Sequence, residues 1–191
     1  TGYLANLTAV TGLARLAPQG NTSIYSAKLN HASLIDGVRL ASAQTNAAVT
    51  LFDHTQLGSL TEALKKDTRP LKLIVTDGVF SMDGDLAPVK ELLTIANQYD
   101  ALLLVDDAHG FGVLGEQGHG ILEQAGVHSE RIIYVGTLGK AAGVSGAFIC
   151  AAAPFIEWLI QKGRPYIYST ATPPAIAHTL RSSLELIEGD E

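Results

Sequence analysis

The stretch ALLLVDDAHGFG, residues 101–112, decides how the rest of the chain is arranged. Five apolar residues are followed by two acids and a histidine, the pattern of a buried strand with polar residues at its C-terminal end. In open α/β sheets, ligands bind at this end of the strands. The stretch GTLGK at residues 136–140 ends in a lysine one predicted strand later. We therefore expect Asp106, His109 and Lys140 to lie at the same edge of a sheet.

Strands and helices alternate on both sides of this stretch. Apolar runs bounded by turns predict strands, and apolar residues three or four apart predict helices. Because the strand that begins 71–85 is a continuous apolar run, the sheet is expected to be parallel and covered on both faces by helices. We predict one α/β domain over residues 1–191, with a mostly parallel, doubly wound sheet and helices on both faces. Strands are expected in 22–27, 48–55, the start of 71–85, 101–105, 131–140 and 143–152. Helices are expected in 2–14, 30–37 (ending at Gly37), 56–66, 88–99, 154–162 and from about 175 onward. An extended segment is expected in 166–174.

Composition and charge restrict the class of partner. Apolar residues make up 47% of the chain and charged residues 17%, as in ordinary globular proteins. The net charge is −6, with no basic stripe, which argues against nucleic acid or an anionic membrane as partner. The longest uncharged stretch, 141–156, is too short to span a bilayer and contains glycine and proline. We expect a small ligand.

The single cysteine bears on the cellular compartment, and the first residue bears on whether the sequence is part of a longer protein. Cys150 is the only cysteine, so no internal disulfide can form, and a reducing, cytoplasmic compartment is expected. The sequence begins at Thr1 without a methionine, which favours a piece of a longer protein.

Two stretches resemble nucleotide-binding motifs in their residues but lack the required context or spacing. GFGVLG, residues 110–115, matches GxGxxG, but DDAH separates it from the strand and no long apolar helix follows. GTLGKA, residues 136–141, has the wrong spacing for a phosphate-binding loop and carries alanine where serine or threonine would bind magnesium. We reject both motifs.

Polar residues at the predicted turns allow more than one interpretation. The helix beginning at Gly2 is either a plain surface helix, the interpretation favoured by that segment alone, or an anion site formed by the amides of Gly2 and Tyr3. His31 is either a polar surface residue or a group that contacts a ligand. His54 is expected to cap or border the turn after its strand.

Lys140 and Asp106 together point to one kind of chemistry. A lysine at a strand end can form a Schiff base with an aldehyde cofactor, and pyridoxal 5'-phosphate (PLP) needs an acid beside its ring nitrogen. A carboxylate at Asp106 would keep that nitrogen protonated and make the ring a stronger electron sink. His109 could contact the ring or its 3-hydroxyl. Singly, the Asp106–Asp107 pair could cap a turn and Lys140 could be solvated; together, on neighbouring strands, they favour catalysis.

Five collinear stretches resemble the α-oxoamine synthases, PLP enzymes of fold type I. These are NHASLIDG (30–37), FSMDGD (80–85), VDDAHGFGVLGEQGHG (105–120), GTLGKAAGVSGAF (136–148) and IYSTATPP (167–174). The resemblance covers nearly the whole chain. It implies that residues 1–191 form the large, PLP-binding domain, without the family's N-terminal segment and C-terminal small domain.

The resemblance implies a role for each matching residue. Lys140 would be the Schiff-base lysine and Asp106 the partner of the pyridine nitrogen, while His109 would contact the 3-oxygen and His31 would stack on the ring. The remaining cofactor contacts would be the amides of Gly2 and Tyr3 at the phosphate, Ser81 and Thr137 by hydrogen bonds, and Ser169 and Thr170 at the phosphate of a neighbouring subunit. A homodimer with shared sites follows, and no metal ligand is implied.

The resemblance also implies a reaction, the decarboxylative condensation of an amino acid with an acyl-CoA or acyl-carrier-protein thioester. FSMDGD, the GEQGHG loop and the pair Asp107–Ala108 favour the branch in biotin biosynthesis, with L-alanine and a pimeloyl thioester as substrates. Lys140 would act as general base, so its pKa must fall from about 10.4, as a cationic, partly buried site would cause. Two alternatives stay open: another member of the family, using glycine or serine with a different acyl-CoA, and an inactive truncated cofactor domain.

Overall fold

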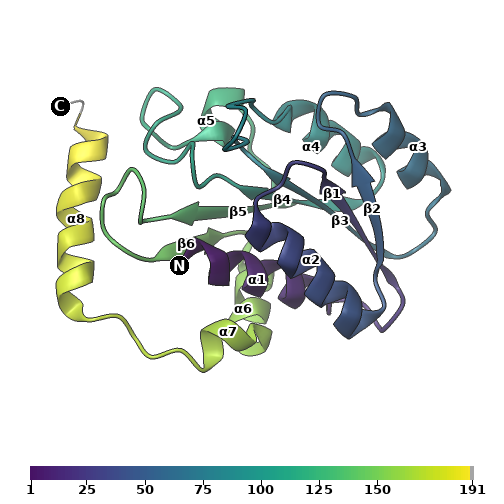
Figure 1. Cartoon of the computed structure of the whole chain (residues 1–191), viewed down its shortest axis with the longest axis horizontal. Helices are drawn as coiled ribbons and strands as arrows, with labels where there is room; N and C mark the ends of the chain where they lie inside the picture. Colours follow the sequence, from purple (N-terminus) through teal and green to yellow (C-terminus); the bar gives the residue numbers. More distant parts are fainter. Residues whose placement is uncertain (190–191) are drawn as a thin grey trace.

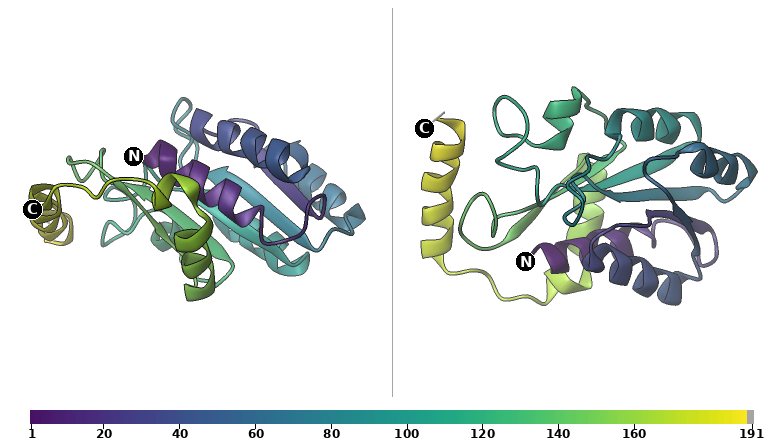
Figure 2. Two further views of the ribbon diagram at one scale, coloured as in Figure 1. Left: turned by 90° about the horizontal axis from the view of Figure 1, so that it is seen from below. Right: turned by 45° about the horizontal axis from the view of Figure 1, so that its top comes forward.

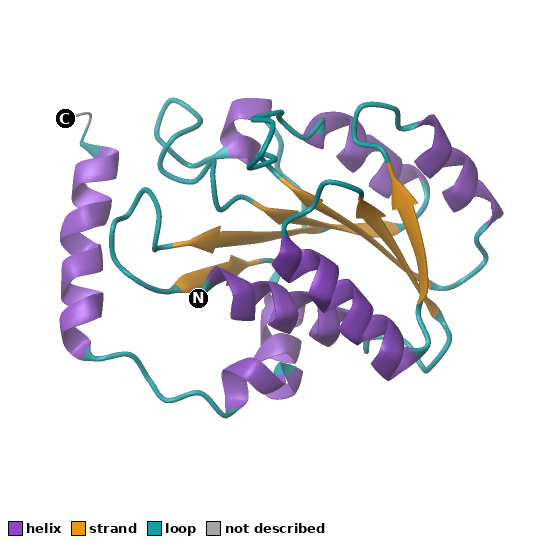
Figure 3. Cartoon of the chain, in the orientation of Figure 1, coloured by secondary structure: helices purple, strands orange, loops and turns teal. Residues whose placement is uncertain are grey.

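Strands β1 to β6 form one sheet in the order β2-β1-β3-β4-β5-β6 in the computed structural model, which describes residues 1–189 (Figure 1). The first four pairings in this order are parallel, and β6 runs antiparallel to β5. Figure 3 shows the strand arrows fanning out across the sheet, as the twist of strands requires. The strands are β1 Thr22–Ala27, β2 Ala48–Phe52, β3 Leu71–Asp77, β4 Ala101–Asp106, β5 Ile132–Thr137 and β6 Ala147–Cys150. The predicted mostly parallel α/β fold is confirmed.

Helices cover both faces of the sheet (Figure 2). Helices α1, α2 and α6 pack on one face, and α3, α4 and α5 on the other. Helix α8 lies apart from the sheet at the end of an extended connection. The helices are α1 Gly2–Leu13, α2 Ala32–Thr45, α3 Gly58–Lys66, α4 Val89–Gln98, α5 Ile121–Ala125, α6 Ala153–Lys162, α7 Arg164–Ile167 and α8 Pro174–Glu188.

The central strands explain this two-sided packing. Successive residues of a strand point to opposite faces. In β4, Leu102 and Leu104 pack with α1 and α2, whereas Leu103 and Val105 pack with α4. A strand that is apolar at every position is therefore buried on both sides, as its sequence predicts.

The predicted end of the second helix at Gly37 is wrong. Helix α2 continues to Thr45 and is terminated by Asn46, which adopts the left-handed conformation with φ 55°. A Cβ atom built on Gly37 would lie 3.3 Å from Cβ of Val10 in α1. Gly37 therefore lets two helices approach closely instead of ending one.

The prediction for His54 also needs correction. Its side chain is only 5% exposed, and its ring stacks on Phe80 with centroids 4.0 Å apart. Nε2 of His54 lies 3.4 Å from Oδ2 of Asp85. His54 thus joins the turn after β2 to the loop after β3, a contact between segments that local sequence does not reveal.

The region after β5 differs in detail from the sequence prediction. Strand β6 occupies only the central part of the expected strand at 143–152. Helix α7 takes up the start of the segment expected to be extended at 166–174. Within residues 1–189, no helix combines the length and apolar character needed to cross a bilayer.

Candidate active site

A pocket of about 160 Å³ lies at the carboxyl ends of β3, β4 and β5. The first turns of α1 and α2 also contribute to it. This is the position at which open α/β sheets bind ligands. The pocket is lined by Gly2, Tyr3, Asn6, His31, Ser33, Asp77, Val79, Ser81, Asp106, Ala108, His109, Thr137 and Lys140. All the candidate residues except Ser169 and Thr170 are therefore brought together.

Asp106 is the last residue of β4, and its side chain is buried, with 6% exposure. One carboxylate oxygen, Oδ2, accepts a hydrogen bond of 2.5 Å from Nδ2 of Asn6. The other, Oδ1, accepts a bond of 3.0 Å from the backbone N–H of Ala108. The carboxylate is therefore held in a fixed orientation at the pocket, because both oxygens have partners.

Lys140 and His109 are both exposed and meet in the lining of the pocket. Nζ of Lys140 lies 2.7 Å from Nε2 of His109. Burial lowers the pKa of Lys140, although Asp106 and Asp77 act in the opposite direction. The pKa of His109 is also lowered, first by burial and then by the charge of Lys140. This direction agrees with the fall expected for the lysine pKa, and its largest cause is burial.

His31 is the N-cap of α2 and is fixed on two sides. Its backbone N–H donates a hydrogen bond of 2.9 Å to Oδ2 of Asp77. Its Nδ1 accepts a bond of 3.2 Å from the backbone N–H of Ser33 and lies 2.7 Å from Oγ of the same residue. The ring is thus anchored through Nδ1 at the edge of the pocket.

Helix α1 brings its N-terminus to the pocket. Thr1 caps the helix, since Oγ1 accepts from the N–H of Leu4 and its carbonyl accepts from the N–H of Ala5. The amides of Gly2 and Tyr3 precede these bonds, in the first turn, where helix geometry supplies no acceptor. Gly2 and Tyr3 are lining residues of the pocket. Such amides, with the helix dipole, favour an anion.

Thr137 and Ser81 complete the predicted lining. A Cβ atom on Gly2 would lie 3.5 Å from Oγ1 of Thr137, so the end of β5 borders the start of α1. Thr137 Oγ1 donates to the carbonyl of Gly146 at 3.3 Å and thereby holds the loop that carries Lys140. Ser81 is exposed in the loop after β3.

Sequence reasoning missed several lining residues, chiefly Asn6, Ser33 and Asp77. Asp77 ends β3 in register with Asp106, and its side chain is 4% exposed. Burial, followed by the charge of Asp106, raises its pKa to about 7. The signals were present, because Asp77 ends an apolar strand as Asp106 does, and Asn6 lies one helical turn after Gly2.

Asp107 has a structural role, one of the interpretations left open by the sequence. It is fully buried, and its Oδ2 accepts bonds from the N–H of Ile121 at 2.7 Å and from the hydroxyl of Tyr134 at 2.8 Å. Burial raises the pKa of Asp107 to about 6. Its side chain holds the loop after β4 against α5 and β5.

Ser169 and Thr170 lie outside the pocket, on the exposed connection between α7 and α8. Oγ of Ser169 donates to the carbonyl of Pro165. Their expected contact belongs to a neighbouring subunit, so their position in one chain leaves that prediction open.

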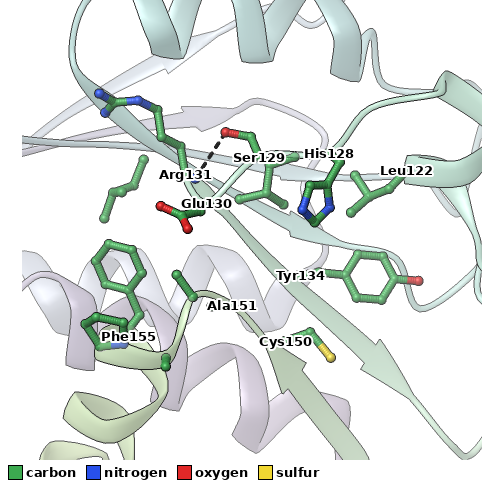
Figure 4. A pocket seen from close by; sticks show the side chains of 14 residues that line it. Leu122, His128, Ser129, Glu130, Arg131, Tyr134, Cys150, Ala151 and Phe155 are labelled. Carbon is green, nitrogen blue, oxygen red and sulfur yellow. Dashed lines mark hydrogen bonds between the residues drawn. The ribbon is translucent and has the colours of Figure 1, made fainter.

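A larger cavity of about 1060 Å³ lies at the start of β5 and the end of β6 (Figure 4). Arg131, Tyr134, Cys150 and Phe155 are among its lining residues. None of the candidate residues lines it, and within residues 1–189 no group of three or more His, Cys, Asp or Glu side chains is placed to hold a metal ion. The smaller pocket therefore holds the candidate chemistry.

Comparison with known proteins agrees with this architecture. The 8-amino-7-oxononanoate synthase of Cupriavidus metallidurans is 56% identical over 191 residues, which cover 100% of this chain and 45% of that protein. A solved structure of SPT (serine palmitoyltransferase) with PLP matches with a TM-score of 0.87 and 34% identity over 100% of this chain and 46% of that one. The 8-amino-7-oxononanoate synthase of Francisella tularensis matches with a TM-score of 0.81 and 35% identity over 98% of this chain and 52% of that one.

The chain thus spans about half the length of the relatives it matches. The sequence profile of the family "Aminotransferase class I and II" matches residues 1–191. With the profile covering every residue, this chain belongs to the aminotransferase class I and II family.

Proposed function

We propose that this chain is the PLP-binding portion of an 8-amino-7-oxononanoate synthase, an enzyme that condenses L-alanine with a pimeloyl thioester and releases CO₂ and the thiol. The main support is that one pocket is lined by the first turn of α1 and by Lys140, Asp106, His109 and His31. The identities of 56% and 54% over the whole chain with two proteins named 8-amino-7-oxononanoate synthase support the choice of branch.

The residues of the pocket fit PLP in charge and in donor type. The first-turn amides of Gly2 and Tyr3 would hold the phosphate, and the buried carboxylate of Asp106 would hold the pyridine nitrogen. Lys140 would bind the aldehyde carbon, and His31 would lie against the ring. Ser81 and Thr137 would add hydrogen bonds. When bound, PLP supplies an aldehyde that condenses with amines and a ring that accepts the electron pair of a carbanion.

The chain's own residues account for the proton transfers. With its pKa lowered by burial, Lys140 is uncharged for a larger fraction of the time near neutral pH and can remove the proton from the α-carbon of the amino acid. His109 lies 2.7 Å away and fixes the position of Nζ. Asp106, fixed by two hydrogen bonds, would stabilise positive charge at the pyridine nitrogen.

We also propose an oligomeric state, a cellular compartment and a domain assignment for the protein. Ser169 and Thr170 lie on an exposed connection away from their own pocket, where they would be available to the phosphate site of a second subunit. The shared sites of a homodimer follow from that assignment. We place the enzyme in the cytoplasm and assign residues 1–191 to its large domain.

An activity panel with the intact protein tests the proposal. L-alanine, glycine and serine would each be paired with pimeloyl, acetyl, succinyl and palmitoyl thioesters, and CO₂ release and product mass would be recorded. We expect turnover with L-alanine and the pimeloyl thioester, and its loss in Lys140→Ala. Lys162→Ala, which removes an amine near Trp158 outside the pocket, is the matched control and should retain activity.

Each contrary result points to a definite alternative. Turnover only with serine and a palmitoyl thioester would assign the chain to the SPT branch, whose structures it matches at 34% identity. Full activity of Lys140→Ala would refute the role given to the lysine.

A further inference from the structure

Asn6 connects two groups of the pocket that lie on different elements. Its side chain projects from α1 and is 1% exposed. Nδ2 lies 2.5 Å from Oδ2 of Asp106, at the end of β4, and 2.8 Å from Oγ of Ser33, in the first turn of α2. An amide nitrogen carries two hydrogens, so both contacts can be donated at once.

The direction of each hydrogen bond in this cluster is fixed by its neighbours. Nδ1 of His31 accepts from the backbone N–H of Ser33, so it carries no proton. The hydroxyl of Ser33 must then donate to Nδ1, over 2.7 Å, and accept from Asn6. A continuous chain of hydrogen bonds therefore runs from the His31 ring through Ser33 and Asn6 to the Asp106 carboxylate.

The orientation of the Asn6 amide is equally determined. Turning it over would place Oδ1 against the carboxylate of Asp106, two acceptors in contact. In the observed orientation, Oδ1 of Asn6 is buried and has no partner among the described residues. A buried acceptor without a partner is destabilising. An apolar residue would avoid this cost but would leave Oδ2 of Asp106 without its donor, so the role of the asparagine lies in the two bonds that Nδ2 donates.

We propose that Asn6 and Ser33 are positioning residues, which hold the Asp106 carboxylate and the His31 ring in one fixed arrangement for the cofactor. This inference rests on the proposed function. Because Asn6 lies one turn after Gly2, the same chain of hydrogen bonds ties the N-terminus of α1, the proposed phosphate site, to β4 and α2. Asn6 thus couples three separate parts of the pocket.

Substitutions of the two residues in the intact protein test this inference. Asn6→Leu removes both bonds donated by Asn6. Ser33→Ala removes the bonds of the hydroxyl to His31 and Asn6 but keeps the bond from Asn6 to Asp106, and alanine is compatible with the helix. We expect Asn6→Leu to raise the dissociation constant of PLP about 10–100-fold, since a bond to a charged group is lost, and Ser33→Ala to raise it several-fold less. Because both act through one chain of hydrogen bonds, the double variant should weaken binding by less than the product of the two single effects.

A spectroscopic readout separates positioning from a general loss of structure. With ¹⁵N-labelled PLP, the chemical shift of the ring nitrogen reports its protonation, which depends on the placement of Asp106. We expect this shift to move toward the unprotonated value in Asn6→Leu. Thr11→Val is the matched control, because Thr11 is a buried residue of the same helix whose hydroxyl bonds only to the carbonyl of Leu7; its PLP affinity and ring-nitrogen shift should equal those of the wild type.

The outcomes distinguish the inference from the proposed function. A wild type that binds PLP, with Asn6→Leu and Ser33→Ala unchanged in affinity and in ¹⁵N shift, would overturn the inference alone. A wild type that does not bind PLP would overturn the proposed function and the inference with it. If Asn6→Leu does not fold, the affinity and shift of Ser33→Ala and its rescue by Ser33→Thr, which restores the hydroxyl, decide the question.

Discussion

At the scale of single residues, the pocket places two buried carboxylates on adjacent strands. Asp77 ends β3 and Asp106 ends β4, in register with each other. Asp106 is satisfied by two donors, whereas Oδ1 of Asp77 is buried without a partner among the described residues. Burial and the neighbouring acid raise the pKa of Asp77 to about 7, which means that the fold disfavours the ionised form of this carboxyl.

The raised pKa predicts how pH changes stability. The pKa of Asp77 is about 7 in the folded chain and 3.8 as its ordinary value. Between these values the folded state binds more protons than the unfolded state, so the contribution of Asp77 to the free energy of unfolding falls as pH rises. We expect Asp77→Asn to gain stability relative to wild type between about pH 5 and about pH 8, measured by urea unfolding without PLP.

Asp83→Asn is the control for this experiment, because Asp83 is exposed in the loop after β3. Its difference from wild type should be the same at both pH values. An equally constant difference for Asp77→Asn would contradict the assignment.

Among the helices, a glycine at a contact sets how closely two of them can pack. Gly37 in α2 faces Val10 in α1, and a Cβ atom there would be 3.3 Å from Cβ of Val10. We expect Gly37→Leu to lower the free energy of unfolding by about 1–3 kcal/mol, because the two helices must move apart. A Cβ atom on Gly58, at the start of α3, would meet nothing within 4 Å, so Gly58→Leu should change stability little. Chemical unfolding of both variants checks this, and equal losses would contradict the packing argument.

The same elements explain what sequence can and cannot predict. Apolar periodicity predicted the strands and most helices, because the pattern of apolar residues within a segment reflects which of its faces are buried. Asp106, His109 and Lys140 could be grouped because parallel strands end at a common edge. Gly37 and His54 were misinterpreted because their roles depend on Val10 and Phe80, residues from other elements. The position of Asn6 one turn after Gly2 was readable from the sequence, but its hydrogen bonds to Ser33 and Asp106 were not, because these partners lie far away in the sequence.

At the scale of the whole molecule, stability is distributed unevenly. Strands β3 and β4 are in the centre of the sheet, and most of their residues are buried. Helix α8 has no buried residue and follows an extended connection (Figure 1). Ser183 of α8 donates a hydrogen bond of 2.6 Å to the carbonyl of Ala142, the link to the loop after β5.

Hydrogen exchange should reveal this difference. In the chain of residues 1–191, the amides of α8 are expected to exchange by local opening, and those of β3 and β4 only by global unfolding. Exchange followed by mass spectrometry or NMR measures both. Equal protection of α8 and β4 would show that α8 unfolds only together with the sheet.

The proposed function requires Lys140 to be the residue that binds PLP. The direct measurement is a visible absorption spectrum of the purified protein with PLP, followed by borohydride reduction and peptide mapping. We predict a yellow complex whose reduced adduct maps to Lys140 alone. An adduct spread over surface lysines, or no adduct, would contradict the claim.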